Sequence, residues 1–335
     1  MLLADPGGAK DLDTRRWDGI LCAARAERLL ASLAWRLDGL DLPDDVLAIL
    51  DSAKADAEIG RTAALWEAEM ARRALAPLSV SVVLLKGTAL VAAGLDAGKG
   101  RQVGDLDILV PRDRLDQVEE VLLAAGWEWV KRDPYDDKYY RRWMHELPPL
   151  IHRDRDRMID VHHTILPLTA RPTPKADLLI ADSNPLENGL RVLSPEDMII
   201  HASAHLLADG DLAGGLHNLW DIDRMVREFS ADRPDFTISL LENERDHGLY
   251  PNVRRALRLS HQVFGTPLQD CTPFNACDFK EERLDRIYRA RIFARDGWGR
   301  QTRPLLRLAF YIRSHWLRMP PFMLAKHLWT KWRKG

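Results

Sequence analysis

The spacing of apolar residues changes abruptly near residue 80, and this change limits the folds that the chain can adopt. From Asp13 to about Leu78, apolar residues recur at three- and four-residue steps, which is the period of amphipathic helices. Residues 82–85 then form a short apolar run with two valines, as in a strand that is buried on both faces. The pattern predicts an N-terminal helical segment over residues 1–78 and a sheet after it.

More apolar runs of strand length follow in the next eighty residues. They occupy residues 106–110, 127–131, 150–151 and 158–165. The last two runs flank a charged turn, which predicts a hairpin. Residues 114–125 have helical spacing instead, and Gly126 is placed to end that helix in a left-handed conformation. The fold class predicted for residues 79–184 is therefore α/β (α+β), a small mixed sheet with flanking helices.

Residues 190–335 return to helical spacing and are predicted to form a helical domain. Ser194 and Pro195 begin it with an N-cap serine and a first-turn proline, and two acidic residues follow. The stretch before it, residues 184–189, reads Asn-Pro-Leu-Glu-Asn-Gly and is dense in turn formers, which favours a linker. We expect the active cleft to lie between the strand-rich and helical parts.

Charge and cysteine content narrow the classes of partner and the compartment. The formal charge is only -2, with 48 Lys and Arg against 50 Asp and Glu, so nothing in the overall charge favours a long nucleic-acid partner. The three cysteines, Cys22, Cys271 and Cys277, match no zinc spacing and are odd in number, which favours a reducing compartment. The sequence contains no secretory signal pattern and no apolar run of transmembrane length. A cytoplasmic location is expected.

Two aspartates at the start of one predicted strand are the most informative chemical feature. Asp105 and Asp107 are two residues apart, so on a strand their side chains project from the same side. Two close carboxylates are tolerated when a divalent cation lies between them or when one holds a proton. Mg²⁺ prefers oxygen ligands and commonly binds one or two carboxylates plus substrate phosphates, so one or two magnesium ions are predicted here. The alternative is that both residues simply face solvent.

The segment before these aspartates offers groups for a phosphate. After the strand at 82–85, Lys86, Gly87 and Thr88 are predicted to form a turn that leads into a short helix at 89–93. A glycine at such a turn lets backbone amides approach a phosphate. Lys86 and Arg101 are the cations nearest the aspartates in sequence, and both are predicted phosphate contacts. The alternatives are a strand-end lysine reaching water and a solvated loop arginine.

This order of elements resembles the DNA polymerase beta-like nucleotidyltransferase superfamily, in which a glycine turn precedes an Asp-x-Asp strand. More closely, Leu-Lys-Gly-Thr-Ala-Leu at 85–90, the run at 101–110 and Ile-Asp-Val-His-His at 159–163 are similar to a bacterial family of uncharacterised nucleotidyltransferases. The resemblance spans roughly residues 80–228. Superfamily members have Gly-Ser or Gly-Gly at the turn where this chain has Gly87-Thr88, a change that keeps the hydroxyl.

The resemblance implies a third carboxylate from a neighbouring strand, and Asp160 is the residue in that position. Asp105, Asp107 and Asp160 would then be the catalytic, metal-binding residues. Asp160 would help to bind a second ion or accept a proton from the acceptor hydroxyl, whose oxygen attacks the α-phosphorus and releases pyrophosphate. His162 shares the face of Asp160 and joins Lys86, Gly87, Thr88 and Arg101 as a predicted nucleotide-binding residue. A solvent-facing Asp160 and a structural His162 are the alternatives.

Two polar pairs in the helical half need a separate interpretation. His201 and His205 are four residues apart on one helix, a spacing that can bind zinc when further ligands converge, but the sequence offers no obvious third ligand. A helix-face or substrate-pocket role is favoured. Asp221 and Asp223 repeat the Asp-x-Asp pattern, but two residues apart on a helix their side chains diverge, so they are not predicted to bind a metal.

The C-terminal residues 303–334 mix aromatic and basic side chains. Such a run can contact a membrane surface or a partner, but a packed terminal helix with solvated lysines has the same composition and is the favoured interpretation. For the whole chain, the leading hypothesis is a transferase that uses a nucleoside triphosphate, ATP included, and a small-molecule or peptide acceptor. The alternative is a catalytically inactive nucleotide-binding or protein-interaction member of the same fold.

Overall fold

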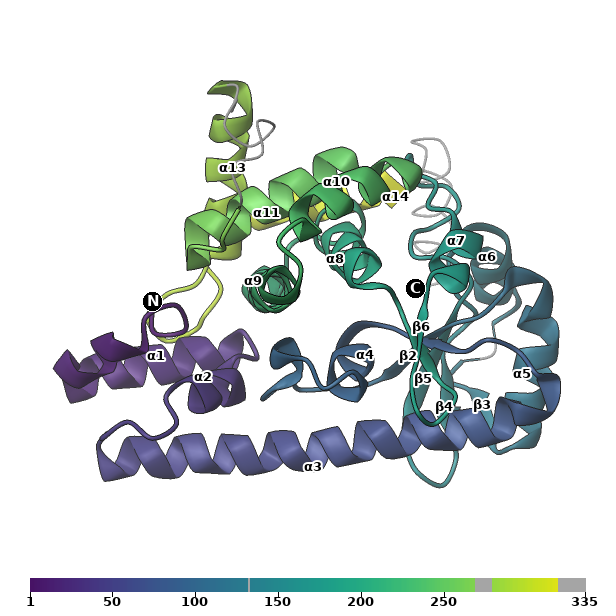
Figure 1. Cartoon of the computed structure of the whole chain (residues 1–335), viewed down its shortest axis with the longest axis horizontal. Coiled ribbons are helices and arrows are strands. Elements are labelled where there is room, and N and C mark those ends of the chain that lie inside the picture. The colour runs from purple at the N-terminus through teal and green to yellow at the C-terminus, as the bar shows by residue number, and fades with distance from the viewer. Residues whose placement is uncertain (132, 269–278, 319–335) are drawn as a thin grey trace.

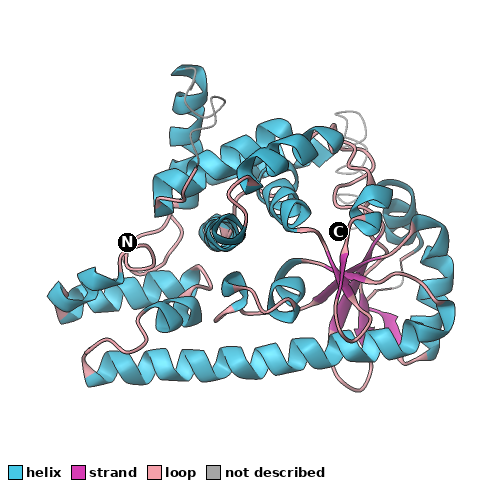
Figure 2. Ribbon diagram, viewed as in Figure 1, coloured by secondary structure: helices cyan, strands magenta, loops and turns pink. Residues whose placement is uncertain are grey.

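The structure is a computed structural model, and it describes residues 1–131, 133–268 and 279–318. One long helix, α3 (Asp44–Leu75), runs beneath the N-terminal helices at one end and the sheet at the other (Figure 1). The helices of the second half form a layer on the opposite side, and the sheet lies toward one end of the molecule (Figure 2). The predicted α+β class is confirmed.

The N-terminal segment is helical, as predicted. It contains the 3-10 turn η1 (Pro6–Asp11) and helices α1 (Thr14–Ala26), α2 (Leu30–Arg36) and α3, which ends in the 3-10 turn η2 (Ala76–Leu78). Asp13 caps α1, because its carboxylate accepts a hydrogen bond from the Arg16 backbone N–H at 2.8 Å. Apolar residues along one side of each helix enter the core.

The sheet has seven strands in the order β3-β4-β5-β2-β1-β7-β6. Its strands are β1 (Val83–Leu84), β2 (Leu106–Leu109), β3 (Trp127–Trp129), β4 (Leu150–His152), β5 (Met158–His162), β6 (Asn184–Pro185) and β7 (Arg191–Val192). Strand β2 is central and pairs antiparallel with β1 and parallel with β5. Val83 and Leu84 are fully buried, which confirms the prediction of a strand covered on both faces.

Two local predictions in the core are confirmed and one is wrong. Strands β4 and β5 form the predicted antiparallel hairpin. Gly126 ends helix α5 (Leu115–Ala124) with a φ of 105°, the left-handed region that favours glycine. The expected linker at 184–189 is instead part of the β6–β7 hairpin at the edge of the sheet. Its turn-forming residues connect two short paired strands, because the residues that favour a linker also favour a hairpin turn.

The other helices of the core surround the sheet. They are α4 (Lys86–Ala92), α6 (Pro134–Trp143) and α7 (Ala176–Ala181), with the 3-10 turns η3 (Asp96–Gly98) and η4 (Arg112–Arg114). The second half contains α8 (Pro195–Ala204), the π-helical turn η5 (His205–Asp209), α9 (Gly215–Asp232), α10 (Phe236–Asp246), α11 (Tyr250–Phe264), α13 (Phe279–Ile292) and α14 (Pro304–Arg318). Ser194 caps α8 by accepting a hydrogen bond from the Asp197 backbone N–H, as predicted.

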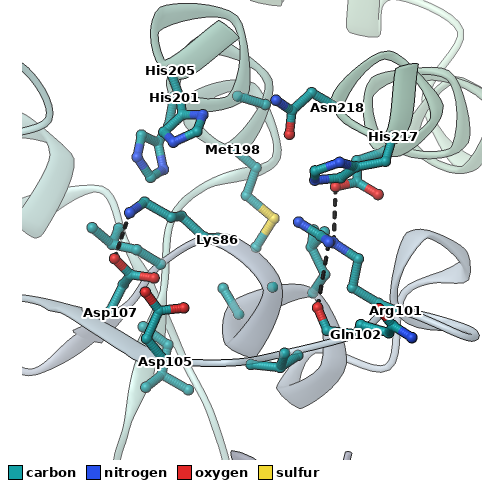
Figure 3. Close-up of a pocket in the computed structure, with 18 of the residues that line it drawn as sticks. Lys86, Arg101, Gln102, Asp105, Asp107, Met198, His201, His205, His217 and Asn218 are labelled. Atoms are coloured by element: carbon teal, nitrogen blue, oxygen red, sulfur yellow. Dashed lines mark hydrogen bonds and ion pairs between the residues drawn. The ribbon is translucent and has the colours of Figure 1, made fainter. Parts of the chain in front are cut away.

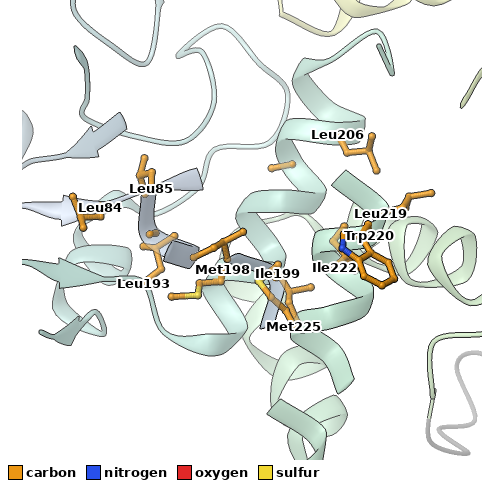
Figure 4. Packing of buried hydrophobic residues seen from close by; sticks show 14 of the residues in the cluster. Leu84, Leu85, Leu193, Met198, Ile199, Leu206, Leu219, Trp220, Ile222 and Met225 are labelled. Carbon is orange, nitrogen blue, oxygen red and sulfur yellow. The ribbon is translucent and has the colours of Figure 1, made fainter. Parts of the chain in front are cut away.

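Helices α8 and α9 contribute to the same buried apolar cluster as the end of β1. Leu84 and Leu85 at the end of β1, Met198 and Ile199 of α8 and Met225 of α9 are members of this cluster (Figure 4). Helix α9 also contacts the 3-10 turn η3 of the core. In the described part of the chain, no helix is both long and apolar enough to cross a membrane.

Gly100 holds the loop before β2 against the N-terminal helices, and we expect Gly100→Ala to destabilise the fold. Its φ is 70°, and a Cβ there would lie 2.5 Å from the backbone of Ala31 and Ser32. Strain and overpacking together should cost about 2–4 kcal/mol, measured as a lowered midpoint of urea unfolding. Gly60→Ala is the control, since a Cβ inside α3 would contact nothing and should stabilise by about 0.5–1 kcal/mol. Equal stability of the two variants would contradict the prediction.

Candidate functional site

A cavity of about 260 Å³ lies between the sheet and helices α8 and α9 (Figure 3). It occupies the place where the sequence predicted a cleft. The core contributes the end of β1, the start of α4 and the loop into β2. The helices contribute mostly polar side chains, namely His201, His205, His217, Asn218 and Asp221.

Asp105 and Asp107 line the floor of this cavity. Asp107 is on β2 and is only 3% exposed, whereas Asp105 lies in the bend just before the strand and is exposed. The two carboxylates face the same part of the cavity (Figure 3). The shared side that the sequence predicted is therefore present, although only one of the pair faces solvent.

Two cationic or polar partners hold the Asp107 carboxylate. Lys86 Nζ lies 2.5 Å from Asp107 Oδ1, and His162 Nε2 lies 2.9 Å from the same oxygen. Burial acts to raise the pKa of Asp107, but the hydrogen bond to His162 and the charge of Lys86 outweigh it. The pKa is held well below its usual range. Asp107 is therefore ionised at neutral pH.

Asp160 lies beside Asp107 on the neighbouring strand. The two residues are direct partners in the parallel β2–β5 register, so their side chains leave the sheet on the same side. Burial, together with the negative charges of Glu146 and Asp107, raises the pKa of Asp160 to about 7. The site thus has more carboxylates than cationic partners to balance them.

The predicted turn at Lys86, Gly87 and Thr88 is wrong, because helix α4 already begins at Lys86. Lys86 enters the helix with a φ of 49°, which directs its side chain back over β2. A Cβ on Gly87 would lie 3.2 Å from the Val103 side chain, so glycine allows the loop before β2 to approach. Lys86 and Gly87 line the cavity, whereas Thr88 is buried and its hydroxyl has no hydrogen-bond partner.

Arg101 joins the core to helix α9. Its Nε lies 3.1 Å from Asp221 Oδ2, and both side chains are largely buried. Burial raises the pKa of Asp221 to about 6, and the Arg101 charge offsets this only in part. Asp223 turns away to pair with Arg224 and Arg227, which confirms the predicted divergence of the two aspartates.

A second group near Asp107 was missed by the sequence analysis. Among the described residues, His145, Glu146 and His162 form the one group of three whose ligand atoms all lie within 4.8 Å of one another. Glu146 Oε2 is 3.6 Å from His145 Nε2 and 3.5 Å from His162 Nδ1. Two imidazoles and a carboxylate suit zinc or a similar metal better than magnesium. Antiparallel backbone pairing between Glu146 and His162 brings the group together, and no pattern of neighbouring residues in the sequence predicts that pairing.

Histidine side chains form the roof of the cavity. His201 and His205 both line the cavity, and the substrate-pocket role of this pair stays a prediction. Burial, followed by the positive charge of Lys86, holds the pKa of His201 well below its usual range. Burial and the Arg101 charge do the same to His217. Neutral imidazoles can donate and accept hydrogen bonds, as an uncharged part of a ligand requires.

The comparison with known families agrees with this architecture. The family described as uncharacterised nucleotidyltransferase matches residues 13–265, well over half of the chain. The chain belongs to this nucleotidyltransferase family. A search of the curated proteins gave no match. Membership makes the chain a transferase with a nucleotide substrate, and nucleotidyltransferases generally use divalent metals. The match extends beyond the predicted region on both sides, so α1 to α3 and α11 are parts of the family fold.

The negative charges crowded around Asp160 predict that the folded chain loses stability as the pH rises. With a pKa of about 7 in the folded chain against 3.8 ordinarily, the folded state binds an extra proton between those values. Stability should therefore fall as the pH rises from about 4 to about 7. In chelator, Asp160→Asn should be more stable than the parent by roughly 2–4 kcal/mol at pH 8 and equal to it near pH 4.

Thermal unfolding at the two pH values measures this difference. Asp51→Asn, on the exposed side of α3, is the matched control and should follow the parent at both. An Asp160→Asn chain that is less stable than the parent at pH 8 would contradict the prediction.

Proposed function

We propose that the chain is a magnesium-dependent nucleotidyltransferase that moves a nucleoside monophosphate from a nucleoside triphosphate to an acceptor hydroxyl and releases pyrophosphate. The main support is the register that aligns Asp107 with Asp160, with Asp105 two residues before on the same side of a cavity. Two carboxylates that line a polar cavity, with the third beside Asp107 on the neighbouring strand, support metal-assisted phosphoryl transfer.

The chemistry of the donor set fits magnesium. Asp105, Asp107 and Asp160 offer only oxygen ligands, which Mg²⁺ prefers, and Asp105 is open to solvent. A bound ion would neutralise charge that Lys86 alone does not balance. When present, it would polarise the phosphate oxygens and stabilise the charge that develops on them. His145, Glu146 and His162 are a competing place for a metal of the zinc type.

Cations around the cavity suit the triphosphate. Lys86 is held by Asp107, and its flexible chain allows it to turn to a phosphate. Arg101 is positioned by Asp221 at the far side of the same cavity. Lys86, Gly87, Thr88, Arg101 and His162 remain the proposed nucleotide-binding residues, and of these Lys86, Gly87 and Arg101 line the cavity, whereas Thr88 and His162 are buried.

Asp160 is the proposed proton acceptor. A general base works best when its pKa is close to the operating pH; the pKa of Asp160 is about 7 when no cation offsets the neighbouring carboxylates, and a cation bound by them would lower it. Asp160 would take the proton of the acceptor hydroxyl as the oxygen attacks the α-phosphorus. In the same proposal, Asp107 stays ionised through its contacts with Lys86 and His162.

The substrates are proposed from the family and from the overall charge of the chain. The donor is a nucleoside triphosphate, ATP included, and the acceptor is a small molecule or a peptide. A near-neutral overall charge disfavours a long nucleic acid. The cysteine content supports a cytoplasmic setting, and we propose that residues 79–184 and 190–335 act as a catalytic core and a substrate-covering domain.

Nucleotide binding tests the proposal directly. Each of the four ribonucleoside triphosphates is added with Mg²⁺, and at least one should raise the melting temperature, because it binds only the folded state. At a ligand concentration of about 100 Kd the gain is about 2.7 kcal/mol. Asp105→Asn/Asp107→Asn should abolish the rise, and Asp51→Asn should keep it. No rise with any triphosphate would overturn the proposal.

Pyrophosphate release then separates an enzyme from an inactive relative. Binding with release on supply of an acceptor supports the transferase, whereas binding without release from any triphosphate, tested against small-molecule and peptide hydroxyls, supports the inactive nucleotide-binding alternative.

The two candidate metal sites can be distinguished by the metal that each binds. His145→Gln should leave the Mg²⁺-dependent stabilisation by nucleotide unchanged within about twofold in affinity, because magnesium is assigned to the aspartates. The same variant should lose any stabilisation by Zn²⁺ alone, measured by thermal unfolding. If Mg²⁺-nucleotide binding is lost in His145→Gln but kept in Asp105→Asn/Asp107→Asn, the magnesium assignment is wrong.

A further inference from the structure

A second polar cavity, of about 160 Å³, lies between helices α2 and α9. Helix α2, the segment from η3 to Lys99 and helix α9 each form one wall. None of the residues that line it also lines the candidate functional site. We call it the α2–α9 cavity, and its charged and aromatic lining residues are Trp35, Arg36, Asp96, Lys99, Trp220 and Arg224.

Hydrogen bonds fix the walls of the α2–α9 cavity. The Ser32 hydroxyl of α2 donates to the Lys99 carbonyl at 3.4 Å. The Asp96 backbone N–H of η3 donates to Glu228 Oε2 of α9 at 2.8 Å. The segment between α4 and β2 therefore lies next to both helices (Figure 1). The cavity belongs to the fold of the chain and does not depend on a loop that must close.

Positive charge exceeds negative charge among the residues that line this cavity. Arg36, Lys99 and Arg224 stand against the one carboxylate of Asp96, so three charges less one leave an excess of +2. Asp96 already has a cationic partner, because Lys99 Nζ lies 2.6 Å from its Oδ1. The structure places this excess of charge in one cavity, whereas the basic and aromatic residues 319–334 lie outside the described residues.

The Arg36 guanidinium is the cation that lacks a carboxylate. Its Nε donates to the Leu3 carbonyl at 3.1 Å, and Arg36 forms an ion pair with none of the described residues. Arg224 has only a shared partner, because Asp223 accepts hydrogen bonds from both Arg224 and Arg227. Burial, followed by the positive charge of Arg224, lowers the pKa of Arg36. A bound anion would relieve this repulsion.

Most polar groups that line the cavity are hydrogen-bond donors. Guanidinium and ammonium groups cannot accept a hydrogen bond, and the indole N–H groups of Trp35 and Trp220 donate to none of the described residues. The Trp220 ring also supports Arg224, whose guanidinium carbon lies 4.4 Å from the ring centroid. A cavity rich in donors and poor in acceptors favours an anion. Planar guanidinium groups match the paired oxygens of a phosphate in particular.

We propose that the α2–α9 cavity binds a phosphate group, either as the free ion or as part of a small phosphorylated molecule. The excess of +2 matches a phosphate dianion. The bound group would join Arg36 of α2 to Arg224 of α9. Asp221, on a different side of α9, pairs with Arg101 in the candidate functional site, so the phosphate would hold a helix that also forms that site. The inference does not depend on the proposed transferase activity.

Thermal unfolding of the full chain tests the proposal in chelator and without nucleotide. Potassium phosphate should raise the unfolding midpoint of the parent in a saturable manner, relative to potassium chloride at equal ionic strength, because it binds the folded state. Arg36→Gln should weaken the phosphate affinity by about tenfold or more. Arg25→Gln is the matched control and should keep the parent affinity. Arg25 is exposed in the last turn of α1, as Arg36 lies in the last turn of α2.

Two further variants locate the bound phosphate. Lys99→Gln, at a half-exposed side chain, should weaken the affinity by about threefold or more, and it provides the same test if Arg36→Gln does not fold. Phosphate should also change the tryptophan fluorescence of the parent, and Trp35→Phe should lose most of that change because Trp35 lines the cavity.

Glycerol phosphate distinguishes the two forms of the ligand. Tighter binding of glycerol phosphate than of inorganic phosphate supports a phosphorylated molecule as the occupant, and the reverse order supports the free ion.

Three results would overturn the proposal. The first is a phosphate effect no larger than that of chloride. The second is an equal effect in the parent, Arg36→Gln and Lys99→Gln, as expected from the general stabilisation that phosphate salts give to folded proteins. The third is an effect that Arg101→Gln abolishes and Arg36→Gln does not, since that would assign the phosphate to the candidate functional site.

Discussion

The buried carboxylate of Asp107 on the central strand is the interaction on which the other parts of the site depend. An ionised group this deeply buried is costly unless it is paired and hydrogen-bonded. Lys86 and His162 meet that need from two different elements, the first residue of α4 and the last residue of β5. Lys86, whose ammonium lies over β2, has a left-handed backbone conformation, and this conformation costs free energy locally. Satisfying one charge thus fixes α4, β2 and β5 relative to one another.

That arrangement leaves a second carboxylate without an equivalent partner. The parallel register must place Asp160 beside Asp107, and the contacts with Lys86 and His162 that lower the pKa of Asp107 do not prevent the pKa of Asp160 from rising. A fold selected only for stability would favour an uncharged residue there. Repulsion between buried carboxylates beside a polar cavity is expected where a cation and a proton transfer are used, and this is the physical basis of the proposed activity.

The features that the sequence predicted well are those with local signals. The β2 strand, the glycine after α5 and the serine before α8 each follow from a pattern of a few residues. The turn at Lys86 was misjudged, because its conformation is set by Asp107, a partner 21 residues away. His145 and Glu146 reach the site only through pairing beside β5. Asp221 was set aside because helical geometry separates it from Asp223, yet that same divergence directs it to Arg101.

The C-terminal helix shows why periodicity alone does not determine which side of a helix is buried. A packed terminal helix was the favoured interpretation, and α14 does pack, but through Phe310 and Ser314. The row from Leu305 to Trp316 is at least as apolar and remains outside. The two sides differ in their contacts. The Phe310 ring packs against Tyr288, and the Arg313 guanidinium donates a hydrogen bond to the Leu207 carbonyl. Those partners are distant in sequence, so no hydropathy pattern reveals them. An apolar row left over after this packing is therefore evidence for a contact outside the described residues.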